Sequence, residues 1–318
     1  MKKVWIIIAA SLVVAGGLIF VGALSSVGFD FSKLNTQKYV TNTYDISDDF
    51  SNIIINCDTA DVVFKLSEDG KCKVVCNEQE KLFHEVSVKD GALVIDIIDS
   101  RAWYDHISFF GDSSEIILYL PANDYGALNI STDTGDINIP KELGFGSISI
   151  KASTADINVS ASAKGKMSIK TSTGDVILNN VTAKEMELSA STGDISVTSA
   201  IVEGYIVAET DTGEVRMTTV HSKGVMITVD TGDITLNSVI STDTFDIKGD
   251  TADVRFIGCD AEAITVETDT GDVTGTLLSD KIFITKTSTG DISVPESTSG
   301  GRCKVTTSTG DIKLSIVK

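Results

Sequence analysis

The sequence predicts an all-β protein, a single-stranded parallel β-helix (β-solenoid) with about 19–20 residues per coil, preceded by one transmembrane helix. Three observations predict it: a short motif recurs at nearly constant spacing, the apolar positions around it alternate as in strands, and a long apolar segment precedes the repeats. These patterns divide the chain into an N-terminal transmembrane anchor (1–29), a linker (30–43), a first coil plus a strand-rich capping insertion (44–126), and a β-solenoid of ten tandem repeats (127–318).

The recurring motif is the tetrapeptide Thr-Gly/Ala-Asp/Glu-Ile/Val. Ten copies follow one another at spacings of 19 or 20 residues, and an eleventh, with Asp61, stands 75 residues upstream. So short a period is typical of a β-solenoid, because helical repeats need ~33 to 47 residues and a propeller blade needs ~40. The ten acidic residues of the array are Asp136, Asp156, Asp175, Asp194, Glu214, Asp233, Asp253, Asp272, Asp291 and Asp311.

The positions around the motif predict two strands and a corner between them. Bulky apolar residues stand eight and six positions before the acid, which is the period of a strand, whereas the residue directly after the acid is Ile or Val. In a straight strand every second side chain faces inward, and here the inward positions shift from even to odd offsets from the acid. The motif is therefore expected to be a corner between two strands. Ala60, Ala155 and Ala252 replace the glycine, which favours close stacking over a positive φ as its reason. Asp or Ser three residues before the acid is expected to cap the turn.

The N-terminal segment reads as a membrane anchor. Lys2 and Lys3 precede an uncharged stretch, 4–29, that is long enough as a helix to cross a bilayer. The two lysines predict a single-pass protein of the cytoplasmic membrane with a cytoplasmic N-terminus and an extracellular C-terminal domain. A cleaved signal peptide is the alternative, because Val21-Gly22-Ala23 resembles a cleavage site.

Both ends of a solenoid expose apolar side chains and strand edges. We therefore interpret the insertion after Asp61 as a cap, with a partner-binding aromatic patch as the alternative for part of it. This aromatic patch would consist of Trp103, Tyr104, Phe109 and Phe110.

At the other end of the solenoid, Lys313 and Lys318 are expected to place charge on the last strand and to discourage end-to-end stacking.

Part of this pattern resembles a known family. The first coil with Thr59-Ala60-Asp61-Val62, the run Ile116-Ile117-Leu118-Tyr119-Leu120-Pro121 and the repeats after it are similar to the bacterial putative adhesin family, over roughly residues 44–318. The resemblance implies a domain of β-strand repeats behind a single membrane helix at the cell envelope. It brings no catalytic residues with it.

The sequence offers no enzyme motif and no cofactor motif. A net charge of -19 would repel nucleic acid. The three His residues are not at metal-ligand spacing, and each is expected to be an ordinary surface or loop residue. The five Cys residues are odd in number, and we interpret them as reduced, mostly core residues.

One constellation could bind a cation. Four consecutive coils carry an acid both in the motif and three residues before it, which would form two ladders with ~4.8 Å between neighbours. Like charges so close are either screened by solvent or bridged by cations, so the hypotheses are a solvated ridge and a calcium site. The pairs are Asp211 with Glu214, Asp230 with Asp233, Asp250 with Asp253, and Asp269 with Asp272.

Together these patterns predict a non-enzymatic surface protein, adhesin-like or a scaffold. Its expected partners are the membrane, through the helix, and an envelope protein or glycan, but not nucleic acid. An accessory of envelope-stress signalling is one alternative and a polysaccharide-active β-helix enzyme is another. An active site should break the repeat locally, and departures such as Arg216 and Arg255 are few.

Overall fold

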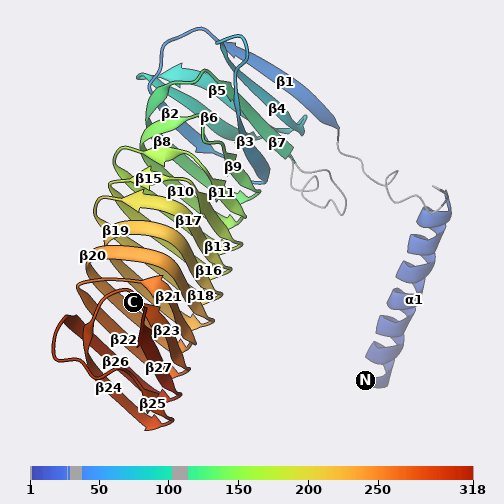
Figure 1. Cartoon of the computed structure of the whole chain (residues 1–318). Coiled ribbons are helices and arrows are strands. Elements are labelled where there is room, and N and C mark those ends of the chain that lie inside the picture. Colours follow the sequence, from blue (N-terminus) through green and yellow to red (C-terminus); the bar gives the residue numbers. More distant parts are fainter. Residues whose placement is uncertain (1, 27, 29–37, 102–113, 318) are drawn as a thin grey trace.

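The computed structural model describes residues 2–26, 28, 38–101 and 114–317. Its one helix among these residues, α1 (Lys2–Ser26), contains a segment, Val4–Gly22, that is long and apolar enough to cross a membrane. The rest of the described chain is nearly all β-structure. It winds into a β-solenoid of about ten turns, so the predicted fold class is confirmed (Figure 1).

Each turn of the solenoid has one strand before the Thr-Gly-Asp corner and one after it, and equivalent strands of successive turns pair in parallel. The strands before the corner are β2 (Asn52–Asn56), β8 (Asp124–Thr134), β10 (Gly144–Thr154), β13 (Lys166–Thr173), β16 (Glu185–Thr192), β18 (Tyr205–Thr212), β22 (Ala263–Thr270), β24 (Lys281–Thr289) and β26 (Gly301–Thr309).

The strands after the corner are β3 (Ala60–Leu66), β9 (Ile137–Ile139), β11 (Ile157–Val159), β14 (Val176–Asn179), β17 (Ile195–Val202), β21 (Val254–Cys259), β23 (Val273–Leu277), β25 (Ile292–Ser293) and β27 (Ile312–Ile316). Two long strands, β19 (Val215–Thr231) and β20 (Ile234–Thr251), run from one corner to the next. Two short strands, β12 (Ser162–Ala163) and β15 (Thr182–Ala183), follow β11 and β14 within the same turns and pair in parallel with neighbouring turns.

The core follows from the register. Ile148 pairs with Leu128 on one side and with Met167 on the other, so equivalent positions stack along the axis. Nine of the ten residues eight positions before the acid are at most 1% exposed, and the tenth, Phe283, is half-buried in the end coil. A fully buried side chain of this size contributes roughly 1.5 to 3 kcal/mol. One continuous apolar cluster therefore extends from Ile53 to Leu314.

The corner glycines have two reasons to be glycine. Gly193 has a φ of +143°, a region that L-residues rarely adopt, and a Cβ placed on it would lie 2.1 Å from the carbonyl oxygen of Gly174 in the preceding coil. Ala155, at the same corner position, has a negative φ. Close stacking, the predicted reason, is thus real, but the expectation that φ plays no part was wrong for the glycine corners.

The corner is capped by its own acid. Asp175 Oδ1 accepts a hydrogen bond of 2.8 Å from the backbone N–H of Asp194 in the next coil, and Asp156 Oδ1 accepts one of the same length from Asp175. The side chains three residues earlier, such as Ser172, are exposed. The capping acceptor is therefore the motif acid and not the earlier Asp or Ser, because the motif acid points along the axis toward the next turn.

A second corner lies five residues after the acid. Asn180, Ser199, Thr219 and Ser238 have φ of +56°, +57°, +55° and +54°, and Gly258 has +59°. A left-handed residue rotates the chain, so the apolar side chain that follows turns inward again. Val181, Val220, Val239 and Cys259 are buried as the sequence predicted, whereas Leu278 is 47% exposed and Leu277 fills that place.

The N-terminal end of the solenoid is covered by five strands: β1 (Tyr39–Ile46), β4 (Cys72–Gln79), β5 (Leu82–Lys89), β6 (Ala92–Asp99) and β7 (Ser114–Leu120). Strands β6 and β7 stack in parallel on β2 and β3. Antiparallel strands then flank this layer, β5 beside β6, and β4 with β1 beside β7. The backbone direction thus changes from parallel to antiparallel at this end.

At the C-terminal end the order of the coils is reversed. Strands β26 and β27 pair with β22 and β23 on one side and with β24 and β25 on the other, so the earlier repeat forms the end of the stack (Figure 1). Lys313 therefore lies on an internal strand, and the expectation that it guards the end was wrong. Lys318 lies outside the described residues. Buried Lys281, with its Nζ 2.6 Å from Asp260 Oδ1, ties the start of β24 back to an earlier turn.

The corner geometry predicts unequal effects of small substitutions. We expect Gly193→Ala to lower the free energy of unfolding by about 2 to 4 kcal/mol, because it adds a left-handed alanine and a clash with backbone. Ala155→Gly should cost only about 1 kcal/mol. Urea unfolding of both variants measures the difference, and equal losses would contradict this account of the corner.

The reversed coil order predicts an unusual response to truncation. Deleting residues 301–318 removes the strands on which β24 and β25 pair, so residues 279–300 should become sensitive to protease as well. Deleting residues 281–300 instead leaves a simple stack in register, and this variant should stay resistant. Limited proteolysis with mass spectrometry reads both results. A resistant 279–300 segment in the first variant would show that the repeats stack in chain order.

Candidate functional site

The predicted site residues are spread over the molecule. The aromatic residues Trp103, Tyr104, Phe109 and Phe110 lie outside the described residues, so their role as a partner-binding patch stays a prediction. The eight corner acids are described and form two rows along one side of the solenoid. The outer row, at Asp211, Asp230, Asp250 and Asp269, is exposed.

The inner row of corner acids is engaged in the fold. Asp233 Oδ1 accepts the backbone N–H of Asp253 at 3.3 Å, and Asp253 Oδ1 accepts that of Asp272 at 2.8 Å. Glu214 is ion-paired with Arg216. The second carboxylate oxygen of each aspartate and the whole outer row are left for solvent or ions, so calcium binding along this ridge stays a prediction.

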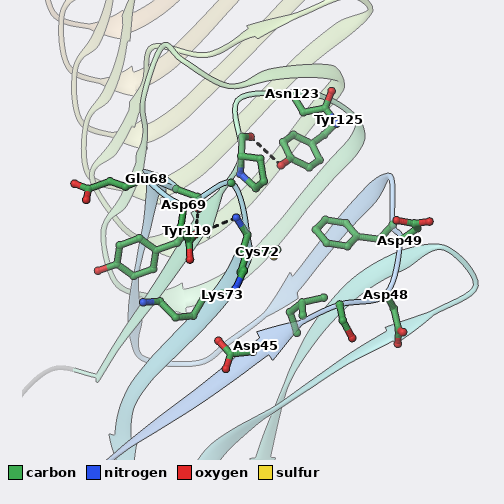
Figure 2. Close-up of a pocket in the computed structure, with 17 residues that line it drawn as sticks. Asp45, Asp48, Asp49, Glu68, Asp69, Cys72, Lys73, Tyr119, Asn123 and Tyr125 are labelled. Carbon is green, nitrogen blue, oxygen red and sulfur yellow. Dashed lines mark hydrogen bonds between the residues drawn. The ribbon is translucent and has the colours of Figure 1, made fainter.

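A large pocket lies where the cap meets the solenoid. Its volume is about 950 Å³. Figure 2 shows that its walls come from the end of β1 and the following loop, the β3–β4 turn, and the segment from β7 to β8. We call it the junction pocket. Its main side chains are Asp45, Asp48, Asp49, Phe50, Glu68, Asp69, Lys71, Lys73, Tyr119, Asn123 and Tyr125.

Charge in the junction pocket is predominantly negative. Five carboxylates and two lysines line it, and the carboxylates come from two sides, the end of β1 with its following loop and the β3–β4 turn. Asp69 is held by the backbone N–H of Lys71 at 3.0 Å and by the hydroxyl of Ser67 at 2.9 Å, and these hydrogen bonds lower its pKa below the usual value. Asp69 therefore stays ionised at neutral and mildly acidic pH. The pocket attracts cationic groups.

Aromatic side chains form the rigid part of the junction pocket. The Tyr125 hydroxyl donates to the carbonyl of Pro121 at 3.0 Å, its ring stacks on Phe50 at 6.0 Å, and burial raises its pKa to about 12. The Tyr119 ring lies 4.5 Å from Lys73 Nζ, a cation–π distance. Tyr125 is buried, whereas the half-buried ring of Tyr119 provides a flat surface on which a ligand can stack.

The junction pocket is lined by carboxylates, lysines, hydroxyl groups and aromatic rings. Its cysteine, Cys72, is buried, and burial raises the pKa of the thiol to about 11, so it is protonated and a poor nucleophile at neutral pH. No histidine lines the pocket. Paired acids, hydroxyls and aromatic faces suit a ligand that carries positive charge or many hydroxyl groups.

Sequence reasoning missed this pocket because three separate segments build it. Asp48-Asp49 and Glu68-Asp69 are acidic pairs in turns, and that is the one signal of the pocket in the sequence.

The expectation that every histidine is an ordinary surface or loop residue was wrong for one of them. His221 is exposed, as expected, and His106 lies outside the described residues, but His84 is 2% exposed.

The five cysteines are free and buried, in agreement with the prediction that they are reduced core residues. Burial raises the pKa of each thiol, to about 12 for Cys303. Cys72 and Cys76 lie on the same buried face of β4 and are not bonded to each other.

Comparison with solved structures gives neighbours of low sequence identity. A putative adhesin from Parabacteroides merdae has 14% identity and a TM-score of 0.48, with 88% of this chain and 97% of that chain covered. A putative adhesin from Parabacteroides distasonis has 12% identity and a TM-score of 0.46, with 87% and 98% covered. A putative lipid binding protein from the same organism has 13% identity and a TM-score of 0.42, with 87% and 97% covered.

No curated protein matches the sequence. The model of one family matches residues 50–211 and 201–318, which together span most of the solenoid and its cap. The repeated corner, the parallel stacking of its coils and this match lead to one conclusion, that the chain belongs to the Toastrack DUF4097 family.

Proposed function

We propose that the chain is a non-enzymatic, adhesin-like protein of the cell envelope, which holds a β-solenoid outside the cytoplasmic membrane and binds an envelope protein or glycan. The observation that carries this proposal is the junction pocket. It is the place where the uniform repeat gives way to loops with paired acids and fixed aromatic rings. Elsewhere the solenoid offers flat, repetitive faces, which suit a scaffold.

The apolar helix α1 supports the location. In this proposal it crosses the cytoplasmic membrane with the two N-terminal lysines inside, so that the cap and its pocket lie nearer the membrane than the far end of the solenoid. A ligand bound in the pocket would then be held close to the membrane surface.

The charge of the pocket favours a ligand with cationic groups. Five carboxylates against two lysines leave an excess of negative charge, and such a surface speeds the encounter with a positively charged partner. A basic segment of an envelope protein or an amine-bearing glycan fits this description. Hydrogen bonds from hydroxyl groups to the carboxylates and stacking on Tyr119 would add specificity.

The test is a binding screen of the full chain in detergent micelles against envelope glycans and extracellular proteins. We expect Asp48→Asn, Asp49→Asn and Asp69→Asn together to weaken binding at least about tenfold, and added salt to weaken binding to the native chain. The matched control is Asp230→Asn, Asp250→Asn and Asp269→Asn, which removes equal charge from the exposed ridge.

Three results would count against the proposal. Equal weakening by the ridge variant would move the binding site away from the pocket. Cleavage of a sugar in the screen would favour a polysaccharide-active enzyme. Capture of a membrane signalling protein through the segment 102–113, with the pocket variants unaffected, would favour the signalling alternative.

A further inference from the structure

A cluster of buried polar side chains lies inside the cap, outside the junction pocket. Cys76 and Glu78 are 0% exposed on the inward face of β4, and His84 is 2% exposed on the inward face of β5. The two strands form a hairpin that pairs with itself only at Gln79 and Leu82. Beyond that pair the strands separate, β4 to pair with β1 and β7 and β5 to pair with β6, so these side chains enter the space between them.

Glu78 is a buried carboxylate that organises the cluster. Its Oε1 accepts a hydrogen bond of 2.7 Å from Asn42 Nδ2. Its Oε2 accepts the backbone N–H of His84 at 2.7 Å and lies 2.7 Å from His84 Nδ1. The carbonyl of His84 in turn accepts the hydroxyl of Tyr44 at 3.0 Å. The backbone of His84 is thus fixed at both of its polar groups, and its ring is fixed through Nδ1.

This arrangement sets the tautomer of His84. A carboxylate oxygen is an acceptor, so Nδ1 carries the proton that it shares with Glu78, and in the neutral ring Nε2 is left with its lone pair. A metal ion held between the imidazole and the carboxylate would take the place of this shared proton, and the ring proton would move to Nε2. His84 Nδ1 and Glu78 Oε2 are therefore the two atoms of this pair that an ion could bridge.

The thiol of Cys76 completes the set. Cys76, Glu78 and His84 each offer a ligand atom, and these three atoms lie within 4.8 Å of one another, a grouping found nowhere else among the described residues. Of the two ring nitrogens it is Nδ1 that faces Glu78, 2.7 Å from Oε2. Ligand atoms around a tetrahedral zinc ion are roughly 3.3 to 3.8 Å apart, so an ion that replaces the proton between Nδ1 and Glu78 needs movements of about an ångström. Thiolate and imidazole together favour zinc and similar transition metals over calcium or magnesium.

We propose that Cys76, Glu78 and His84 form a structural site for one transition-metal ion of the zinc type inside the cap, where the ion ties β4 to β5. Such an ion gains a thiolate ligand only by displacing its proton, and burial together with the charge of Glu78 raises the pKa of Cys76 to about 12. Binding therefore releases one proton to solvent for each ion bound. Because the site is closed, the ion is expected to enter while the cap folds or opens.

Cobalt is the probe for this site, because it takes zinc positions and its spectrum reports the ligands. The full chain is purified in detergent micelles, stripped with a chelator after brief mild denaturation, and refolded with one equivalent of Co²⁺. We expect one ion per chain, a thiolate-to-cobalt charge-transfer band in the near ultraviolet, and a rise in the unfolding temperature with Zn²⁺. The absence of stoichiometric binding, or a cobalt spectrum without the thiolate band, would overturn the proposal.

The matched variants are Cys76→Ser and Cys72→Ser. Both cysteines are buried on the same face of β4, but Cys72 is outside the cluster. Cys76→Ser should abolish the thiolate band and Cys72→Ser should leave it unchanged, and the opposite result would refute the site. His84→Gln should lower the affinity at least about tenfold.

A second measurement decides the matter where the Cys76 variant fails to fold. In the native chain under mild denaturation, Zn²⁺ should slow alkylation of Cys76, as mapped by mass spectrometry, relative to Cys259 in the distant solenoid core. Equal rates at both cysteines, with and without zinc, would show that the ion does not bind there. Failure of this site leaves the junction pocket and its binding role untouched, because the two share no ligand residue.

Discussion

The structure depends on how closely two successive turns can approach at the Thr-Gly-Asp corner. The ladder of parallel backbone hydrogen bonds requires equivalent residues to stack directly, and at the corner this brings backbone against backbone. At Gly193 there is no room for a side chain, and the left-handed backbone turns the chain from one face of the solenoid to the next. At the next position the side chain of the motif aspartate accepts the backbone N–H of the equivalent residue in the following turn, as Asp175 does from Asp194. Hydrogen bonding between turns therefore continues through the corner.

The same stacking gives the acid row a structural role beyond charge. Most of the motif aspartates accept the backbone N–H of the next corner, and a charge-assisted hydrogen bond of this kind offsets part of the repulsion between neighbours. A repeat can therefore keep an acid at every turn without an ion between them. The four acids of the outer row are exposed. They recur at the same spacing as the inner row because each lies three residues before a motif acid.

The regular part of the fold could be predicted from the sequence, because the period, the change of phase and the apolar positions are local and repeat many times. Ile148, Met167 and their equivalents were placed inward on that basis, and they are buried. The reversed order of the last two coils could not be predicted, since Asp291 and Asp311 both keep the period and either could stand at the end. The junction pocket and the Cys76–Glu78–His84 cluster depend on how non-repeating strands pair in the cap, and such pairings between distant strands leave no periodic trace.

The reversed coil order has a consequence for how the chain comes to be folded. Synthesis proceeds from the N-terminus, and up to β23 each new turn finds a finished template on which to add its strands. The next segment, β24 and β25, finds its proper neighbour missing, and must wait until the final residues of the chain settle between it and the growing stack. The last two turns are thus assembled as one cooperative step, in which β26 and β27 must be in place before β24 and β25 can join the stack.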